Sequence, residues 1–251
     1  MEVHSHTHPA SGGTRKKWTH YFWEFLMLFL AVFCGFLAEY QLEHIIEKDR
    51  EKQLIKSLVI DLQADTARLK TIIKNRAEKI VRLDSLRWLL NSPSVKQYGN
   101  EIYYNAIHTG RRIETRFTPN DGTLQQLKNA GGLRLIRNRA VVDLITKYDV
   151  GTRNLLFLGE YETFAIESYR QVAYKIFNSS VFEVMLDEEN YATRPVDNPS
   201  LLPFGTDVLN EFNFSIYTIK LVNKGLRRDT GKLLGEAINL LSTLKKEYHL
   251  E

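Results

Sequence analysis

The sequence contains one cysteine, and it shows no sustained alternation of polar and apolar residues between turn signals. A single thiol cannot form a disulfide within the chain, so no disulfide framework is expected. Strands of a half-buried sheet alternate with a period of two, and the missing alternation argues against a sheet. The formal net charge of +4 is too small to indicate nucleic-acid binding. We therefore expect an all-α protein with no nucleic-acid partner.

The motifs of several enzyme classes are also missing. No histidine stands three residues after a glutamate, so the metal motif of carboxylate bundles is absent. The sequence has no glycine-rich phosphate loop, no Gly-x-Ser-x-Gly motif and no pair of cysteines to hold a metal. His108 stands alone and is interpreted as a helix-end residue. We expect no enzyme activity and no cofactor.

A nearly unbroken apolar run occupies residues 21–40 (YFWEFLMLFLAVFCGFLAEY). At about 1.5 Å per residue, a helix of this length spans roughly 30 Å, the thickness of a bilayer's hydrocarbon core. A cleavable signal peptide is the alternative, but no small-x-small site follows the run. A lipoprotein would use Cys34, yet Phe33 stands where that processing needs a small residue. We interpret residues 21–40 as an uncleaved signal anchor with the lipid bilayer as its partner.

The charges beside the run predict its orientation. Arg15, Lys16 and Lys17 precede it, whereas Glu39 and Glu43 follow it. Because positive residues stay on the cytoplasmic side, residues 1–20 should be a cytoplasmic tail and residues 41–251 should lie outside. The predicted location is the cytoplasmic (inner) membrane, with a periplasmic domain if the cell is Gram-negative.

Beyond the span the pattern remains helical. Residues 39–90 contain no proline or glycine, and apolar residues recur at steps of three and four. The apolar stripe is wider than a coiled-coil seam, so it needs partner helices on more than one side. The sequence therefore predicts one helix of about 70 residues, running from the span to residue 90, where Asn91-Ser92-Pro93 ends it.

The rest of the chain predicts further helices joined by loops. They are expected at residues 101–108, 123–130, 140–182 and 206–248. Asn138 is a plausible N-cap of the third, which Gly151 and Gly159 kink or divide, and residues 187–203 form a loop. No linker or internal repeat is evident. The predicted fold is all-α, with a single transmembrane helix continuing into one elongated antiparallel helical bundle.

Three stretches resemble a group of single-pass bacterial membrane proteins that carry a helical domain of unknown function. They are KKWTHYFWEFLMLFLAVFCGFLAEYQLEH, DREKQLIKSL and FTPNDGTLQQLKNAGGLRLIRN. The resemblance covers about the first 150 residues. It implies a membrane protein of the same topology and adds no mechanism.

The tail and the span offer two candidate sites. His4, His6 and His8 alternate near the amino terminus, a spacing that can chelate Zn, Cu or Ni. The alternative is a flexible tail whose histidines are composition only. Glu24 is an acid within the span, close to its first residue, and an intramembrane acid suggests a proton path. Its place near the membrane edge, one turn from His20, favours a paired interfacial carboxylate instead.

A group of arginines is the third candidate: Arg111, Arg112, Arg116, Arg134, Arg137 and Arg139. Guanidinium groups beside a helix start can hold a carboxylate or phosphate. The alternative is a set of solvated or salt-bridged side chains, with Asp121, Asp143 and Asp149 as available partners.

Two functions are compatible with these features. The first is a membrane-anchored structural or interaction protein that binds a protein partner or forms a homo-oligomer. The alternative is an extracytoplasmic sensor that binds a small anionic ligand at the arginines and shifts a helix through the anchor. Because a tail of about 20 residues is far below domain size, such a sensor would signal through a partner inside the cell.

Overall fold

The computed structural model describes residues 17–129 and 131–250. Within this part of the chain every regular element is a helix, and one isolated antiparallel bridge joins Leu186 to Ala192. The chain is therefore all-α, as the missing alternation predicts. Its contacts divide it into two compact units, Met1–Glu51 and Lys52–Glu251. The first helix, α1 (Lys17–Leu90), contributes to both units.

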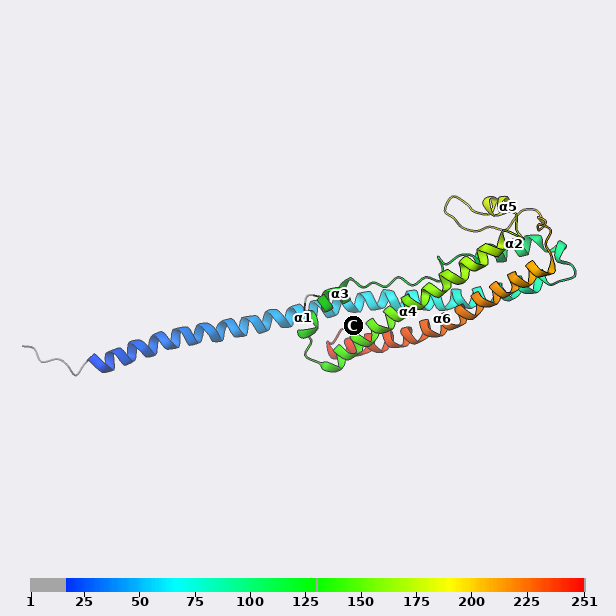
Figure 1. Ribbon diagram of the computed structural model, residues 1–251. Helices are drawn as coiled ribbons and strands as arrows, with labels where there is room; N and C mark the ends of the chain where they lie inside the picture. Colours follow the sequence, from blue (N-terminus) through cyan, green and yellow to red (C-terminus); the bar gives the residue numbers. More distant parts are fainter. Residues whose placement is uncertain (1–16, 130, 251) are drawn as a thin grey trace, which may run out of the picture. The chain divides into compact units, whose positions relative to one another are not determined.

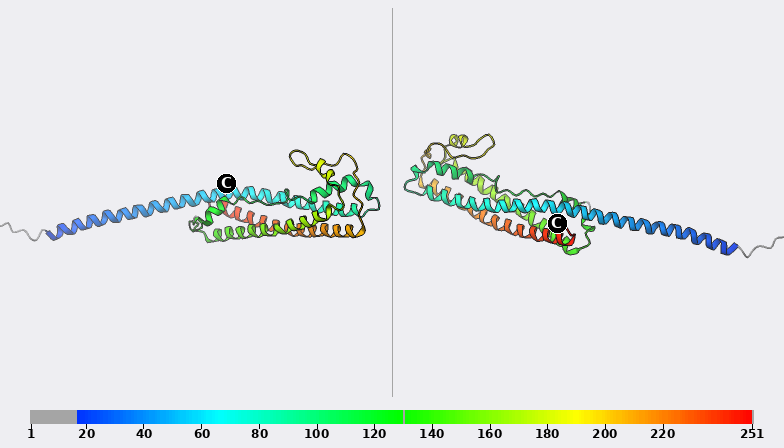
Figure 2. Two further views of the ribbon diagram at one scale, coloured as in Figure 1. Left: turned by 45° about the horizontal axis from the view of Figure 1, so that its top comes forward. Right: turned by 180° about the vertical axis from the view of Figure 1, so that it is seen from behind.

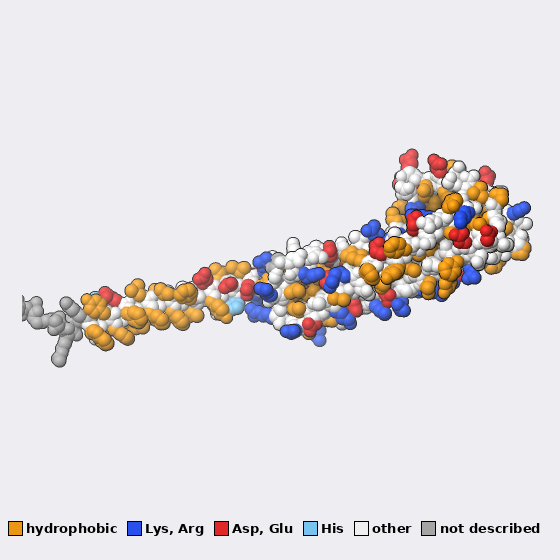
Figure 3. Space-filling view, viewed as in Figure 1, with side chains coloured by type: hydrophobic (Ala, Val, Ile, Leu, Met, Phe, Trp, Pro, Cys, Tyr) orange, Lys and Arg blue, Asp and Glu red, His pale blue; other side chains and the backbone are white. Residues whose placement is uncertain are grey.

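The described part of the first unit is the N-terminal part of α1. Its large apolar side chains are exposed, with Trp18 85% and Phe25 66% accessible, and Figure 3 shows them along this stretch. An 18-residue window has a mean hydropathy of 2.0 and no buried residue. This segment is thus long and apolar enough to cross a membrane.

The second unit combines the C-terminal part of α1 with five further α-helices and two 3-10 turns. They are Val95–Gln97 (η1), Gly99–Thr109 (α2), Gly122–Asn129 (α3), Gly132–Arg134 (η2), Arg139–Ala173 (α4), Ser179–Val184 (α5) and Thr206–Glu247 (α6). In this unit α1, α4 and α6 lie side by side (Figures 1 and 2). Ion pairs join Lys147 to Glu236 and Lys175 to Glu211, so α4 and α6 run in opposite directions.

The helix boundaries mostly follow the sequence signals. Helix α1 ends at Leu90, and the Asn138 side chain caps α4 by accepting a hydrogen bond from the backbone N–H of Ala140 at 3.0 Å. Gly151 does not divide α4. A Cβ at this position would lie 3.1 Å from Leu233 Cδ1 and 2.5 Å from Glu236 Oε2, so glycine permits α4 to approach α6 closely.

The helix expected at residues 140–182 ends earlier than the sequence pattern suggests. Helix α4 stops at Ala173, and the remaining predicted turns form the separate α5. The backbone N–H of Asn178 donates to the Tyr103 hydroxyl at 2.9 Å, while the Asn178 side chain caps α5. Between α4 and α5, the Phe177 side chain is buried in the core, with 3% of its surface exposed. A tertiary hydrogen bond and one buried ring therefore break a pattern that is locally helical.

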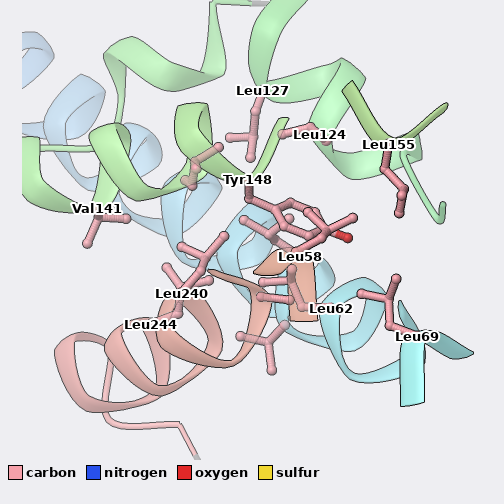
Figure 4. Packing of buried hydrophobic residues seen from close by; sticks show 14 of the residues in the cluster. Leu58, Leu62, Leu69, Leu124, Leu127, Val141, Tyr148, Leu155, Leu240 and Leu244 are labelled. Carbon is pink, nitrogen blue, oxygen red and sulfur yellow. The ribbon is translucent and has the colours of Figure 1, made fainter. Parts of the chain in front are cut away.

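Two hydrophobic clusters form the core of the second unit. The first joins α1, α3, the N-terminal half of α4 and the C-terminal half of α6, and its packing is shown in Figure 4. The second joins the end of α1 to α2, the end of α4 and the start of α6. On each long helix the two clusters are separated by buried polar residues, namely Arg76 and Lys79 on α1, Glu162 on α4 and Asn223 on α6.

Phe212 and Phe214 form a matched pair for testing this core. Phe212 is fully buried, with its ring centroid 4.9 Å from that of Tyr169, whereas Phe214 is 68% exposed. We expect Phe212→Ala to lower the free energy of unfolding by about 3–5 kcal/mol, since it leaves a cavity. Phe214→Ala should change it by about 0.5 kcal/mol or less. Urea unfolding of the detergent-solubilised chain measures both; equal losses would contradict the assignment of the core.

Candidate functional site: a buried charged layer

The carboxylate of Glu162 lies at the centre of the second unit and is fully buried. Its Oε1 accepts hydrogen bonds from Lys79 Nζ at 3.2 Å, Thr115 Oγ1 at 3.2 Å and Asn223 Nδ2 at 3.3 Å. Its Oε2 accepts one from Arg76 Nη2 at 3.1 Å. The donors come from α1, α6 and the segment after α2, so one carboxylate links four parts of the fold. We call these five residues the charged layer.

The two cations of α1 also hold the connector formed by residues 110–121. Arg76 Nη2 donates to the carbonyl of Thr115 at 2.8 Å, and Lys79 Nζ donates to the carbonyl of Arg111 at 2.8 Å. Arg76 Nη1 donates to Asn223 Oδ1 at 2.8 Å as well. An irregular segment has carbonyls without helical partners, and these side chains satisfy two of them inside the protein.

The electrostatics of the layer keep Glu162 ionised. Burial alone would raise the pKa of its carboxyl, but Lys79 and Arg76 outweigh that effect and hold the pKa below its ordinary value. Burial lowers the pKa of Lys79, and Glu162 offsets part of the shift. A carboxylate held ionised by two cations is a poor general acid or base near neutral pH, because its proton affinity is far from matched to that pH.

A second polar cluster fixes the other end of the connector. Asp65 of α1 is 1% exposed; its Oδ2 accepts a hydrogen bond from the Tyr148 hydroxyl at 2.7 Å, and its Oδ1 accepts from the backbone N–H of Asn120 at 3.0 Å. Burial and then Asp65 raise the pKa of Tyr148, which therefore remains a donor. Between the two ends, Asn75 Nδ2 donates to the carbonyl of Glu114 at 2.8 Å. Side chains of α1 thus attach the connector along its length.

Arg112 reaches the charged layer from the connector. Its Nε lies 3.9 Å from Glu162 Oε2, an ion-pair distance too long for a hydrogen bond, and its Nη2 donates to the carbonyl of Gly159 at 3.1 Å. Together with Arg76 and Arg116 it lines a cavity of about 80 Å³ between the connector, α4 and α6.

A larger groove of about 900 Å³ opens between α2, α4, α5 and the loop that follows α5. Its lining is mainly apolar and includes Ile107, Phe177 and Phe182, with Arg111 and Arg170 among its polar residues. Arg111 Nη2 donates to the carbonyl of Asn190 at 2.5 Å. A groove of this size and lining has the dimensions of a site for an apolar segment or molecule.

The structure separates the six predicted arginines into two groups. Arg111, Arg112 and Arg116 belong to the connector beside residues 76–79 of α1. Arg134, Arg137 and Arg139 are exposed and adjoin η2, where Gly132 packs against Leu54 of α1. Because α1 rises by about 1.5 Å per residue, these two levels are roughly 35 Å apart, and the six arginines do not form a single group.

Asp149, one of the ion-pair partners expected for these arginines, pairs with other residues. Asp149 pairs with Lys128 at 2.9 Å and with Arg153 at 3.2 Å. The Glu162 carboxylate, which the sequence analysis did not single out, is the partner of Arg112 instead.

The remaining predicted site residues are the N-terminal histidines and Glu24. His4, His6 and His8 lie outside the described residues. Within the described ranges, no group of three His, Cys, Asp or Glu side chains could hold a metal. Glu24 Oε1 lies 3.1 Å from His20 Nε2, which matches the expected pairing one helical turn apart.

A sequence signal for the charged layer exists in α1. Buried positions recur there at alternating steps of three and four: Ile55, Leu58, Leu62, Asp65, Leu69, Ile72, Arg76, Lys79, Leu83, Leu86 and Leu90. Asp65, Arg76 and Lys79 thus occupy core positions of an otherwise apolar stripe. The register of the stripe places them inside, although charged side chains usually lie on a solvated face.

Comparisons of the chain with protein-family models, with curated proteins and with solved structures find no match.

Glu162 and Glu160 provide a matched test of the charged layer. Glu162→Gln leaves buried cations without a counter-charge, and we expect it to lower the free energy of unfolding by about 3–5 kcal/mol. Glu160 is exposed two residues away on the same helix, so Glu160→Gln should change it by about 0.5 kcal/mol or less. Denaturant unfolding compares the two variants, and a small effect at position 162 would contradict this role of the carboxylate.

The same pair predicts a pH dependence. Because folding depresses the pKa of Glu162, its stabilising contribution is complete above the ordinary value of 4.5 and is lost as pH falls through the depressed pKa. The difference between wild type and Glu162→Gln should therefore shrink below pH 4.5, whereas the effect of Glu160→Gln should not follow this course.

Proposed function

We propose that this protein is a membrane-anchored helical structural or interaction protein without catalytic activity. In this proposal residues 21–40 cross the cytoplasmic membrane, residues 1–20 lie in the cytoplasm, and residues 41–251 form an elongated antiparallel bundle outside. The observation that carries it is the exposed apolar segment of α1, because contact between so many large apolar side chains and water is unfavourable. The resemblance to single-pass bacterial membrane proteins implies the same topology.

The surface of the second unit supports a role in protein contacts. Phe157, Tyr161 and Phe164 are exposed at steps of four and three along α4 and thus share one face of that helix. On α6, Phe214, Tyr217 and Leu221 are exposed at steps of three and four. We call these six residues the apolar rows; Figure 3 shows hydrophobic side chains among the charged ones on one face of this unit.

The register of α4 and α6 places the two rows at overlapping levels along the second unit. Glu162 contacts Asn223, and the helices run in opposite directions, so Phe164 lies at the level of Leu221. Exposed aromatic side chains are typical of the centres of protein interfaces. A protein partner or a second copy of the chain that covers the rows would complete the proposed function.

The anchor is tested by placing charges in the proposed span. Leu30→Arg with Val32→Arg should prevent membrane insertion, because each arginine costs about 2.5–3.5 kcal/mol near the middle of a membrane helix. Ile45→Arg with Ile46→Arg, outside the proposed span, should leave the chain in the membrane. Alkaline extraction of membranes, with protease added to intact spheroplasts, measures insertion and orientation; extraction of the wild type or protection of its C-terminal region would contradict the proposal.

The interaction role is tested at the apolar rows. Tyr161→Glu with Phe164→Glu should abolish the crosslinked partner or oligomer recovered with the tagged chain from membranes. Ile60→Glu with Val81→Glu is the control, since both side chains are exposed on α1. Recovery of the same crosslinked species from the row variant as from wild type, or its equal loss from the control, would contradict a contact through the rows.

A second function is the sensing of a small anionic ligand, with signalling through a partner. The observation that favours it is the excess of basic side chains around the cavity beside the charged layer. Co-purification of a kinase, cyclase or channel subunit would support this function, whereas a purely exterior partner would favour the first.

A further inference from the structure

The cavity beside the charged layer carries more positive than negative charge. Its charged lining residues are Arg76, Arg112, Arg116 and Glu160. In the charged layer Arg76 pairs with Glu162, which also pairs with Lys79. Four basic side chains thus face two acidic ones, and even without Lys79 the arginines outnumber the acids. Among the buried groups, Arg76, Lys79 and the partly buried Arg112 face the single carboxylate of Glu162. Because a buried cation is stable only when paired, this excess favours a further negative charge.

Two hydrogen-bond donors at this cavity are also unused. The Nε–H groups of Arg76 and Arg112 are buried and find no hydrogen-bond partner among the described residues. Arg76 is 3% exposed, and its two Nη atoms are already bonded to Asn223, Thr115 and Glu162. A buried donor without a partner costs about 1–3 kcal/mol, more when it belongs to a charged group, so an acceptor at this place would be stabilising.

The size of the cavity limits the ligand. Its volume is about 80 Å³. One water needs about 10–15 Å³ on the same measure, so the space suits a group of roughly five heavy atoms. Phosphate and sulfate have this size, offer acceptors in several directions and bind guanidinium groups through paired hydrogen bonds. Exposed Arg116 adds a third guanidinium at the cavity, where a ligand can exchange with solvent.

We propose that the cavity lined by Arg76, Arg112 and Arg116 is a binding site for a tetrahedral oxyanion, either a free ion or the phosphate group of a larger molecule. This site rests on the second function proposed above, because it specifies the chemical class of the anionic ligand and the residues that bind it. The ligand would lie against the connector, α4 and α6, next to the charged layer. Its binding would neutralise the excess charge and join Arg112 to Arg76.

The test measures the melting temperature of the full detergent-solubilised chain in phosphate, sulfate or chloride at matched ionic strength. At ten times the dissociation constant, phosphate should raise it by about 3–6 °C over chloride. Arg116→Ala and Arg112→Ala should both remove the shift. Arg116 is exposed, so Arg116→Ala is the cleaner variant, whereas Arg112 also contacts Glu162 and Gly159. Arg139→Ala is the control, because this exposed arginine belongs to the other group, and it should retain the full shift.

A measurement with glycerol phosphate distinguishes a free ion from the phosphate group of a larger molecule as the ligand. A shift with this monoester as well as with inorganic phosphate supports a site for a phosphate group on a larger molecule, and a shift with the inorganic ion alone supports a site for the free ion. Three results would overturn the proposal: no difference between phosphate or sulfate and chloride in wild type, an unchanged shift in both Arg112→Ala and Arg116→Ala, or an equal loss in Arg139→Ala. Since binding is measured directly, a chain that binds phosphate but recruits no signalling partner would remove the sensor function and leave the site intact.

Discussion

The helical domain formed by residues 52–251 depends on one buried ion, the carboxylate of Glu162. A charge taken out of water is expensive, and this one is stable because two cations of α1, an amide of α6 and a hydroxyl of the connector all donate to it. These four donors come from three segments, namely α1, α6 and the connector. The position of α4 relative to α1, α6 and the connector is therefore fixed by polar geometry at this level, while the two apolar clusters on either side supply most of the burial.

This arrangement explains why the core contains charges at all. An apolar stripe with steps of three and four allows helices to slide by one heptad with little change in packing, because equivalent positions carry similar side chains. Arg76 and Lys79 break that equivalence, since only one register places them against Glu162. The same residues satisfy carbonyls of the connector, so an irregular segment can cover α1 without unpaired backbone groups. Arg112 contacts both the charged layer and the cavity of the proposed oxyanion site, so the excess positive charge of the layer lies beside that site.

Much of the fold could be predicted from the sequence, because it follows from local pattern. The all-α class, the end of α1 at Leu90 and the cap at Asn138 follow from periodicity and capping. The end of α4 at Ala173 could not be predicted, because a hydrogen bond to Tyr103, far away in the sequence, breaks a helical pattern. The candidate site was predicted only in part. Arg112 and Arg116 were identified from the sequence, whereas Arg76 and Lys79 were not singled out, although their positions in the apolar stripe of α1 indicate burial.

The central claim is that Arg76 and Glu162 stabilise the domain through each other. A double-mutant cycle tests it most directly, using Arg76→Met, Glu162→Gln and the double variant in the full detergent-solubilised chain. Contacting residues in one polar network have coupling energies of about 0.5–3 kcal/mol, and for this buried pair we predict a value of about 1.5 kcal/mol or more. Additivity of the two single effects within about 0.5 kcal/mol would contradict the claim that this ion pair organises the fold.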